Sequence, residues 1–424
     1  MNAREVALRV IYACHSQGAW ADGALKRELA RAGLDSRDAA LASRLVYGVE
    51  QNRLLLDYDL APFVARGLDS LEPRVRDILR LGAYQLLMLD KIPAMAAVNE
   101  SVNLAKGCCK NPRTAGFVNA VLRNLDRKRD SLPALPGNGL ERLSVQYSHP
   151  LWLVKEFALT AGPEELEALL AADNAPAPVT AQVNTLKTTP QALIQRLAEE
   201  GVSAGVHPAL DGCLVLENLG NLESSKAFRD GLFYIQDPAC RMAVLAAEPK
   251  AGDRVLDLCA APGGKSFAAA VAMEDKGHIL SRDLYERKVK ELYSSAARLG
   301  LSCVQTAVAD ATEPVEGQYD LVIADVPCSG LGIIRKKPDI RYKDPEELDG
   351  LLPIQAKILE NAAAAVIPGG RLLYATCTLR RAENEDQVER FLDKAENFTV
   401  KTMETLWPHR HGTDGFFYAV LERR

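Results

Sequence analysis

The feature that most restricts the fold of this 424-residue chain is a repeated pattern of strand, turn and helix that begins near residue 250. Five apolar runs are predicted as strands, and the segments between them, such as 286–298 and 345–366, are predicted as helices. The predicted strands cover residues 254–258, 278–282, 303–308, 321–324 and 371–375, and a last strand covers 416–421. Strands that alternate with helices form a parallel sheet, so the pattern predicts an open, doubly wound α/β domain.

The turn after the first of these strands has the composition of a nucleotide-binding loop. It reads Cys259-Ala260-Ala261-Pro262-Gly263-Gly264-Lys265, and its small residues let backbone amides approach a ligand at the start of the next helix. Asp283 and Asp310 end the next two strands, where one carboxylate can accept the hydroxyls of a ribose and the other can meet an adenine amino group. The loop and the two acids predict a pocket for an adenosyl group.

Two other nucleotide sites are disfavoured by the same residues. Gly264-Lys265-Ser266 is similar to the end of a phosphate-binding P-loop. However, Cys259 stands where that loop requires its first glycine, and Pro262 interrupts it. The Gly-x-Gly-x-x-Gly string of dinucleotide sites is absent here.

Two cysteines, 49 positions apart, each follow a predicted strand. Cys328 lies in Asp325-Val326-Pro327-Cys328-Ser329-Gly330, and Cys377 lies in Tyr374-Ala375-Thr376-Cys377-Thr378. Open sheets bind ligands at the carboxyl ends of their strands, so both thiols are candidates for covalent chemistry. The remaining cysteines outside the cofactor loop are interpreted as unreactive core residues: Cys14, Cys108, Cys109, Cys213, Cys240 and Cys303.

A thiolate beside an adenosyl pocket predicts methyl transfer to carbon-5 of cytosine in RNA. Carbon-5 is a poor nucleophile, but addition of a thiolate to carbon-6 makes it able to attack a sulfonium methyl group. An acid that hydrogen-bonds ring nitrogen-3 assists the addition, and Asp325 is placed for that role or for holding the cofactor amine. These residues leave open which of the two thiols attacks.

Residues 256–266, 325–330 and 374–378 resemble the motifs of the RNA cytosine-5 methyltransferases of the NOL1/NOP2/Sun family. The resemblance implies that Cys377 is the nucleophile, that Cys328 assists product release, and that S-adenosyl-L-methionine is the cofactor. Thr378 and Gln182 depart from the family, which commonly has serine and arginine there. The implied cofactor site consists of Cys259, Ala260, Ala261, Pro262, Gly263, Gly264, Lys265, Asp283, Arg287, Asp310 and Asp325.

Residues 1–132 are predicted as an all-helical domain. Apolar residues of 75–89 fall on one helical face, with Gly82 allowing close approach of a neighbour, and the last helix starts near Asn111-Pro112. The stretches 97–100 and 116–123 resemble a NusB-type RNA-binding domain. That combination resembles the bacterial enzymes that methylate a cytosine of 16S ribosomal RNA. A solvated helical bundle without an RNA-binding role is the alternative.

A Pro- and Gly-rich stretch at 132–139 is predicted as a linker. Residues 140–240 are predicted as a small α+β module, with helices at 164–172 and 190–200 and strands at 179–183, 212–216 and 231–235. Residues 241–424 then form the Rossmann-like methyltransferase domain. The chain is therefore expected to be multidomain, with an all-α bundle, an α+β module and an α/β domain.

A basic run follows the first cysteine motif directly. Residues 335–343 place five cations around one acid, and Tyr342 could stack on a base. A solvated loop is the alternative, but the position beside the proposed active site favours RNA. The predicted RNA contacts are Arg335, Lys336, Lys337 and Arg341.

Composition restricts the partners only weakly. The net charge is −5, yet residues 1–130 hold 20 Lys and Arg against 15 Asp and Glu, so net charge does not decide nucleic-acid binding. No signal-peptide pattern, no uninterrupted apolar run of about 18 residues and no zinc-ligand spacing occurs, so we expect a cytoplasmic monomer without metal or membrane association. The alternatives are a methyltransferase acting on transfer RNA or other RNA, a DNA cytosine-5 enzyme with Cys328 as nucleophile, and a non-catalytic ribosome assembly factor.

Overall fold

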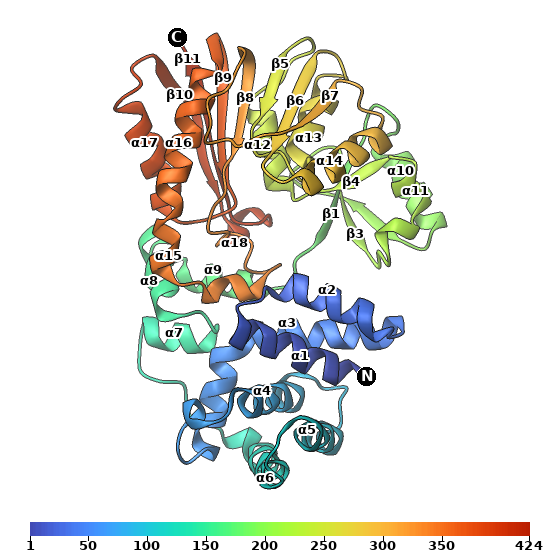
Figure 1. Ribbon diagram of the computed structural model, residues 1–424, viewed down its shortest axis with the longest axis vertical. Coiled ribbons are helices and arrows are strands. Elements are labelled where there is room, and N and C mark those ends of the chain that lie inside the picture. The colour runs from blue at the N-terminus through green and yellow to red at the C-terminus, as the bar shows by residue number, and fades with distance from the viewer. The chain divides into compact units, whose positions relative to one another are not determined.

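The computed structural model describes residues 1–424 and divides into two compact units, and most of its α-helices and strands are labelled in Figure 1. The first unit contains residues 1–174 and 334–343, and the second contains residues 175–333 and 344–424. Residues 140–240, expected as one module, are divided between the units. The helices of residues 140–174 belong to the first unit, where α7 (Leu140–Gln146) packs on α3 (Ser36–Leu60).

The first unit is helical, as its apolar periodicity predicts. Its α6 (Arg113–Lys128) starts directly after Pro112, and α1 (Ala3–Gln17) starts at a capping box in which Asn2 and Glu5 satisfy each other's backbone amides. The remaining elements are α2 (Ala21–Ala32), α4 (Pro73–Met88), α5 (Ala94–Cys108), α8 (Leu151–Ala161), α9 (Leu166–Asn174), and the short 3-10 helices η1 (Ala61–Phe63), η2 (Leu68–Ser70), η3 (Arg129–Ser131) and η5 (Pro338–Tyr342).

Two glycines allow the helices of this unit to approach closely. A Cβ atom on Gly48 of α3 would lie 1.9 Å from the ring of Tyr84 in α4. A Cβ atom on Gly82 of α4 would lie 2.5 Å from Leu122 of α6. The close approach predicted at Gly82 is confirmed, since any larger side chain there would displace a core leucine.

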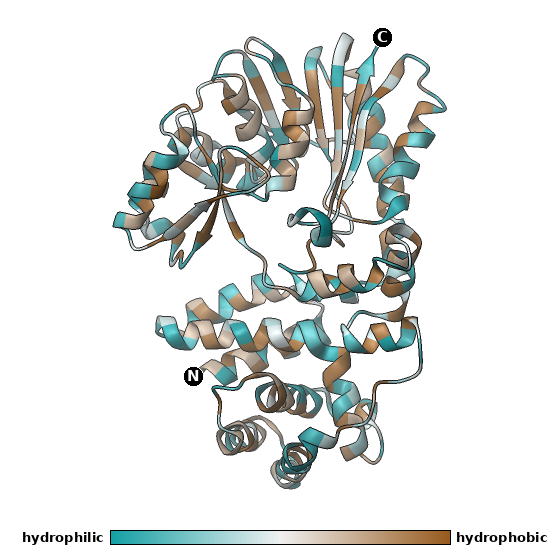
Figure 2. Cartoon of the chain, turned by 180° about the vertical axis from the view of Figure 1, so that it is seen from behind, coloured by the Kyte–Doolittle hydropathy of each residue, from teal (hydrophilic) through white to brown (hydrophobic).

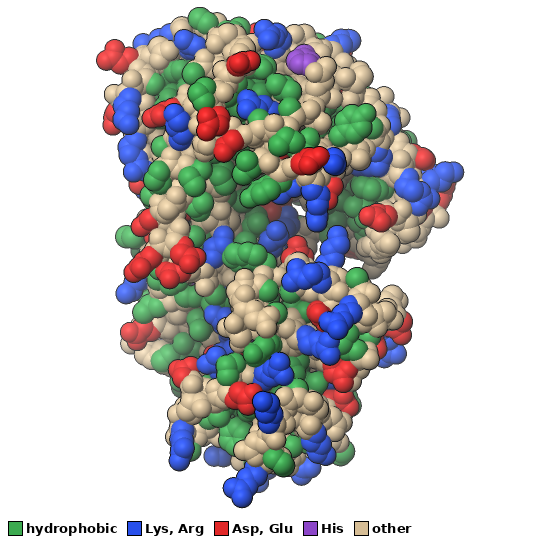
Figure 3. Space-filling view, in the orientation of Figure 1, with side chains coloured by type: hydrophobic (Ala, Val, Ile, Leu, Met, Phe, Trp, Pro, Cys, Tyr) green, Lys and Arg blue, Asp and Glu red, His purple; other side chains and the backbone are tan.

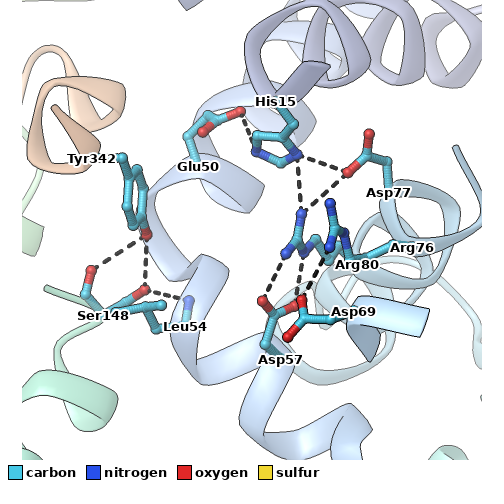
Figure 4. A network of polar contacts seen from close by, with 10 residues as sticks. All are labelled: His15, Glu50, Leu54, Asp57, Asp69, Arg76, Asp77, Arg80, Ser148 and Tyr342. Carbon is cyan, nitrogen blue, oxygen red and sulfur yellow. Dashed lines mark hydrogen bonds and ion pairs between the residues drawn. The ribbon is translucent and has the colours of Figure 1, made fainter. Parts of the chain in front are cut away.

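A buried polar network joins α1, α3 and α4 (Figure 4). His15 lies between two carboxylates, with Nε2 3.1 Å from Glu50 and Nδ1 2.7 Å from Asp77. Arg80 pairs with Asp57 at 2.7 Å and with Asp77 at 3.2 Å. Burial alone would lower the pKa of His15, but hydrogen bonding to Asp77 and Glu50 outweighs burial and raises it. The imidazolium form therefore supplies a positive charge to Glu50 and shares Asp77 with Arg80.

The second unit begins with a small antiparallel sheet of strand order β2-β3-β1-β4. Its strands are β1 (Val179–Val183), β2 (Ser203–Val206), β3 (Cys213–Glu217) and β4 (Phe233–Ile235), with helices α10 (Pro190–Glu199), η4 (Leu222–Ser224) and α11 (Lys226–Arg229). The predicted strands β1, β3 and β4 are present. The edge strand β2 escaped prediction because three of its four residues are exposed and carry no apolar pattern.

A seven-stranded sheet of order β10-β11-β9-β8-β5-β6-β7 forms the centre of this unit. Strands β5 to β9 are mutually parallel where they pair, and β11 runs antiparallel to β9 and β10. The strands are β5 (Arg254–Asp257), β6 (His278–Asp283), β7 (Val304–Val308), β8 (Tyr319–Asp325), β9 (Val366–Thr376), β10 (Phe398–Leu406) and β11 (Phe416–Arg423). The chain order reverses between β5 and β8, which is the position where open α/β sheets bind ligands.

Helices cover both faces of the large sheet. Alternate strand residues point to opposite faces: Val255 and Ile323 enter one core, and Leu256 and Val322 enter the other. Figure 2 shows the strands largely in the colour of apolar residues. The first core is shared with α12 (Pro238–Ala246), α13 (Gly264–Ala272) and α14 (Glu286–Leu299), and the second with α16 (Leu351–Ala364) and α17 (Glu385–Leu392). The connecting elements are α15 (Pro345–Asp349), η6 (Arg381–Glu383) and α18 (Pro408–His411).

Candidate active site

Two thiols meet at the carboxyl edge of the large sheet. Cys328 follows β8 and Cys377 follows β9, and these parallel neighbours are paired with Asp325 opposite Ala375. The two Sγ atoms lie 3.3 Å apart, and both side chains are partly exposed. The sequence prediction that strand-end cysteines come together is confirmed.

The two thiols differ in acidity because they interact with each other. The hydrogen bond to Cys328 lowers the pKa of Cys377, and a nearby Lys265 adds to this against the effect of burial. The same hydrogen bond, burial and the charges of Glu383 and Asp325 raise the pKa of Cys328. The shared hydrogen bond therefore makes Cys377 the more acidic thiol of the pair and favours the proton on Cys328.

A buried ion pair connects the glycine-rich loop with the first cysteine motif. Lys265 donates to Asp325 Oδ2 at 2.6 Å, and its ammonium also lies 5.0 Å from the ring centre of Phe416. Burial would lower the pKa of Lys265, but the Asp325 carboxylate outweighs burial and raises it. The predicted pocket residues Lys265 and Asp325 are thus bound to each other across the reversal in strand order.

The predicted cofactor loop is a tight turn between β5 and α13. Gly263 has φ +112°, and a Cβ atom there would lie 2.2 Å from the ring of Phe267, so only glycine fits. Ala260 donates its amide to the carbonyl of Arg282 at 2.8 Å, and Ala261 donates to Asp283 Oδ2 at 3.3 Å. The loop is therefore attached to the end of β6, where Asp283 is located.

A fully buried acid, at the end of the strand that precedes this loop, hydrogen-bonds to the helix that follows it. Asp257, the last residue of β5, accepts a hydrogen bond from Ser266 at 2.7 Å, and Ser266 is 2.7 Å from the Ser281 hydroxyl. Burial raises the pKa of Asp257 to about 7 despite the Ser266 hydrogen bond. The other oxygen of Asp257 has no hydrogen-bond partner. In the sequence Asp257 lies inside an apolar run, which gave no signal of a functional residue.

Two further predicted cofactor residues lie on the surface. Asp310 is exposed after β7 and accepts hydrogen bonds from the amide and hydroxyl of Thr312, which lower the pKa of Asp310. Arg287 is 87% exposed on α14 and pairs with Glu291 at 3.1 Å. Asp310 thus ends a strand of the sheet as expected, whereas Arg287 interacts with its own helix.

The predicted RNA contact Arg341 is wrong, because this side chain is fully buried in the first unit. Its guanidinium donates to the carbonyls of Gln51 and Ser148 at 3.0 Å and of Tyr147 at 3.3 Å, and to Asn174 Oδ1 at 3.0 Å. With its donors directed into the protein and no exposed surface, Arg341 attaches segment 334–343 to the helices instead of binding RNA.

The remaining residues of this segment are divided between the interior and the surface. Tyr342, expected to stack on a base, has the Arg53 guanidinium 3.3 Å from its ring centre and its hydroxyl 3.2 Å from Ser148 Oγ (Figure 4). Its ring is therefore engaged within the first unit. Lys337 is exposed, while Arg335 and Lys336 are half-buried, so these three cations retain surface for a ligand.

Three buried polar residues beside the cysteines were not predicted from the sequence. Gln355 of α16, Glu383 of η6 and the adjacent Asn384 are at most 1% exposed and hydrogen-bond to the two cysteine loops. The only signal in the sequence was a polar Glu383-Asn384-Glu385 run shortly after Cys377. A polar run of this kind is usually solvent-exposed, so it did not indicate a site.

The surface and the helices add three observations. Figure 3 shows basic and acidic side chains interspersed over the visible face. The structure contains no group of three or more His, Cys, Asp or Glu side chains arranged to hold a metal ion. None of its helices combines the length and hydropathy needed to cross a lipid bilayer.

Three family models match successive parts of the chain. A family described as "16S rRNA methyltransferase RsmB/F" matches residues 244–422, the NusB family matches residues 1–127, and the RsmF/B-like ferredoxin-like domain matches residues 149–223. The Bacillus subtilis protein named "Probable ribosomal RNA small subunit methyltransferase B" is 34% identical over 100% of this chain and 99% of its own length.

A second relative and a solved structure agree with these matches. Ribosomal RNA small subunit methyltransferase B of Vibrio cholerae is 31% identical over 100% of this chain and 98% of its own length. The crystal structure of PH0851 is 27% identical, with a TM-score of 0.82 over 99% of this chain and 98% of that one. The similarity to these proteins, in sequence and in fold, therefore extends over nearly the entire chain.

Proposed function

Because the chain belongs to the RsmB/F family of 16S ribosomal RNA methyltransferases, we propose that it methylates carbon-5 of a cytosine in that RNA, with Cys377 as nucleophile and S-adenosyl-L-methionine as methyl donor. The observation that carries the proposal is the pair of thiols 3.3 Å apart at the carboxyl edge of the sheet. A methyltransferase whose acceptor atom is an oxygen or a nitrogen has no need of a thiolate, because that atom is itself a nucleophile, whereas carbon-5 of cytosine requires a thiolate at carbon-6 before it can attack a methyl group.

The residues at the ends of β5, β6 and β7 fit an adenosyl group. Asp283 and Asp310 supply carboxylate oxygens for hydroxyl and amino groups, and the Gly263-Gly264 turn exposes backbone close to the start of α13. Gln236 lies against Gly264 and has a buried Oε1 without a hydrogen-bond partner, which a donor of the ligand can satisfy. When bound, S-adenosyl-L-methionine supplies a methyl group activated by a positively charged sulfur.

The chain's own residues supply the rest of the chemistry. The Cys377 thiolate forms a bond to carbon-6, and the electron pair of the 5,6 double bond moves to carbon-5, which accepts the methyl group. Asp325 hydrogen-bonds the ring at nitrogen-3, where negative charge accumulates, in its protonated form, because an ionised carboxylate cannot donate; Lys265, 2.6 Å from Asp325 Oδ2, supplies that proton. Carbon-5 then loses its proton to water, the bond between sulfur and carbon-6 breaks, and Cys377 leaves as a thiolate. The Cys328 S–H group stabilises that leaving thiolate by hydrogen bonding.

Three cations that follow the first cysteine motif are proposed to bind the RNA backbone. Arg335, Lys336 and Lys337 keep exposed surface, in contrast to Arg341. Backbone phosphates need local positive charge and not a positive net charge, so the acidic composition of the chain is compatible with this role. The target cytosine must be unpaired or flipped to reach Cys377.

Variants of the two cysteines test the proposal. Cys377→Ala is expected to abolish methylation of 16S ribosomal RNA. Cys328→Ala is expected to accumulate a covalent protein–RNA adduct that migrates slowly under denaturing conditions. Cys109→Ser, which changes a thiol in the helical unit, serves as the control and should behave like the unmodified protein. Full activity of Cys377→Ala would refute the assignment, and an adduct between Cys328 and duplex DNA would favour a DNA enzyme.

A further inference from the structure

Cys328 is held from both sides by two buried side chains. Gln355 donates to the carbonyl of Pro327 at 3.0 Å, directly before the cysteine. Glu383 Oε2 accepts the amide of Ser329 at 2.8 Å, directly after it. Gln355 also donates to the same Glu383 oxygen at 2.9 Å, so the two side chains form one clamp around the cysteine. Both are fully buried, which keeps these hydrogen bonds away from competing water.

Cys377 is held in the same way by Asn384, the residue that follows Glu383. Asn384 Oδ1 accepts the hydroxyl of Thr376 at 2.6 Å, and Asn384 Nδ2 donates to the carbonyl of Thr378 at 3.0 Å. These two threonines are the immediate neighbours of Cys377. Thr378 Oγ1 is in turn 2.7 Å from Ser329 Oγ, which joins the two cysteine loops one residue beyond each thiol. The polar contacts therefore restrain both loops relative to one another.

We propose that Glu383 and Asn384 are the positioning residues of the two thiols, with Asn384 setting the loop of Cys377 and Glu383, together with Gln355, setting the loop of Cys328. Consecutive residues share one backbone segment, so the two clamps move together. They restrain the sulfur atoms at the separation of 3.3 Å that lets the thiols share one proton. The interpretation of the adduct experiment below rests on the proposed function, whereas the thiol titration does not.

Glu383 also influences which of the two thiols keeps the shared proton. Two donors, from Ser329 and Gln355, converge on one of its oxygens, which suits a carboxylate, and the other oxygen has no hydrogen-bond partner. A negative charge beside Cys328 opposes ionisation of that thiol and so leaves the proton on Cys328. The charged and titratable groups that face the two thiols, besides each other, are Glu383, Asp325, Lys265, Asp414 and the buried phenol of Tyr374.

The first test is a thiol titration of the full-length protein without RNA. Iodoacetamide alkylation at a series of pH values, followed by peptide mass spectrometry, gives a separate pH midpoint for Cys328 and for Cys377. Glu383→Gln keeps the side-chain shape and an acceptor oxygen but removes the charge, so the midpoint of Cys328 should fall and the two midpoints should converge. Glu385→Gln, whose carboxylate accepts from Thr405 and not from a cysteine loop, is the matched control and should leave both midpoints unchanged.

The second test separates formation of the covalent adduct from its breakdown. The substrate is 16S ribosomal RNA stripped from ribosomes of cells that lack this protein, together with S-adenosyl-L-methionine. Glu383→Gln should prolong the adduct about tenfold, the rate equivalent of one weakened charge-assisted hydrogen bond. Asn384→Ala should slow adduct formation about tenfold and leave its lifetime unchanged. Thr376→Val, which removes only one of the two Asn384 contacts, should give the same effect in weaker form if Asn384→Ala does not fold.

A positioning role requires that the Asn384 substitution slows adduct formation and that the Glu383 substitution slows adduct breakdown. If folded Glu383→Gln and Asn384→Ala, or Thr376→Val, show unchanged midpoints and unchanged adduct kinetics, or slow formation and breakdown in parallel, the inference is wrong. If neither cysteine forms an adduct, the proposed function fails, and the alkylation midpoints still decide the positioning role.

Discussion

Lys265 Nζ lies 2.6 Å from Asp325 Oδ2, and this ion pair joins the glycine-rich loop after β5 to the end of β8. The strand order reverses between these two strands. The pair thus connects the predicted adenosyl side of the pocket to the side that carries the thiols. Lys265 is 8% exposed and Asp325 is 31% exposed. An unpaired charge is therefore more unfavourable on Lys265, because its ammonium group has less contact with water.

Removing the charge of one member of this pair should lower the free energy of unfolding more than removing both charges. Asp325→Asn leaves the buried ammonium of Lys265 without a counter-charge, and we expect it to lower the free energy of unfolding by about 3 kcal/mol. The double variant Lys265→Met with Asp325→Asn should recover part of that loss, because no buried charge remains. Urea unfolding of the two single variants and the double variant measures the difference. Additive losses would contradict the coupling.

Arg341 should affect stability and not RNA binding. Arg341→Lys keeps the charge but cannot satisfy four acceptors, so we expect a loss of about 2 kcal/mol or more in the first unit. The salt dependence of RNA binding should be unchanged, whereas Lys337→Ala should reduce its slope by about 1 if Lys337 contacts a phosphate. Filter-binding titrations at several salt concentrations measure both slopes. A reduced slope for Arg341→Lys with normal stability would restore the original RNA assignment.

His15 should stabilise the first unit most strongly at mildly acidic pH. The pKa of His15 is raised in the folded protein, so its contribution is complete below the unfolded value near 6.5 and is lost as pH rises through the folded value. His15→Gln should lower the free energy of unfolding by about 3 kcal/mol at pH 6, since Glu50 and Asp77 lose their shared cation. Hydrogen exchange in α1 and α4 at pH 6 and pH 9 measures this. An equal effect of His278→Gln, in the other unit, would contradict it.

Asp257 should make the second unit less stable as pH rises. Its pKa is raised by burial from 3.8 to about 7, so the folded state holds the proton more tightly and stability falls from about pH 4 through pH 7. The shift corresponds to on the order of 4 kcal/mol at most. Asp257→Asn keeps an acceptor for Ser266 and should abolish this decline. Urea unfolding between pH 4 and pH 8 compares the two proteins. Asp310→Asn is the control, because Asp310 is exposed and its pKa is lowered, and parallel curves for Asp257→Asn would refute the prediction.

The buried strands of the sheet and its edge strand β7 could be read from the sequence, but the other edge strand, β10, could not. β8 and β9 are apolar runs because both of their faces are covered by helices, and such runs are recognisable. β10 is an edge strand in which only Phe398 and Leu406, at its two ends, are buried, so it has no apolar run to recognise. The strands that position the site were therefore predictable, and the edge strand β10 was not.

The order of the elements, the glycine turn after β5 and the placement of both cysteines at strand ends follow from the sequence alone, because these depend on local periodicity and on neighbouring residues. Which charges are buried depends instead on the packing of distant segments. Arg341 looks like its neighbour Lys337 in the sequence, yet its partners lie at residues 51, 147, 148 and 174, and contacts over such separations leave no local pattern. The same holds for Glu383 and Asn384, whose clamps around Cys328 and Cys377 exist only once the strands and α16 have packed together.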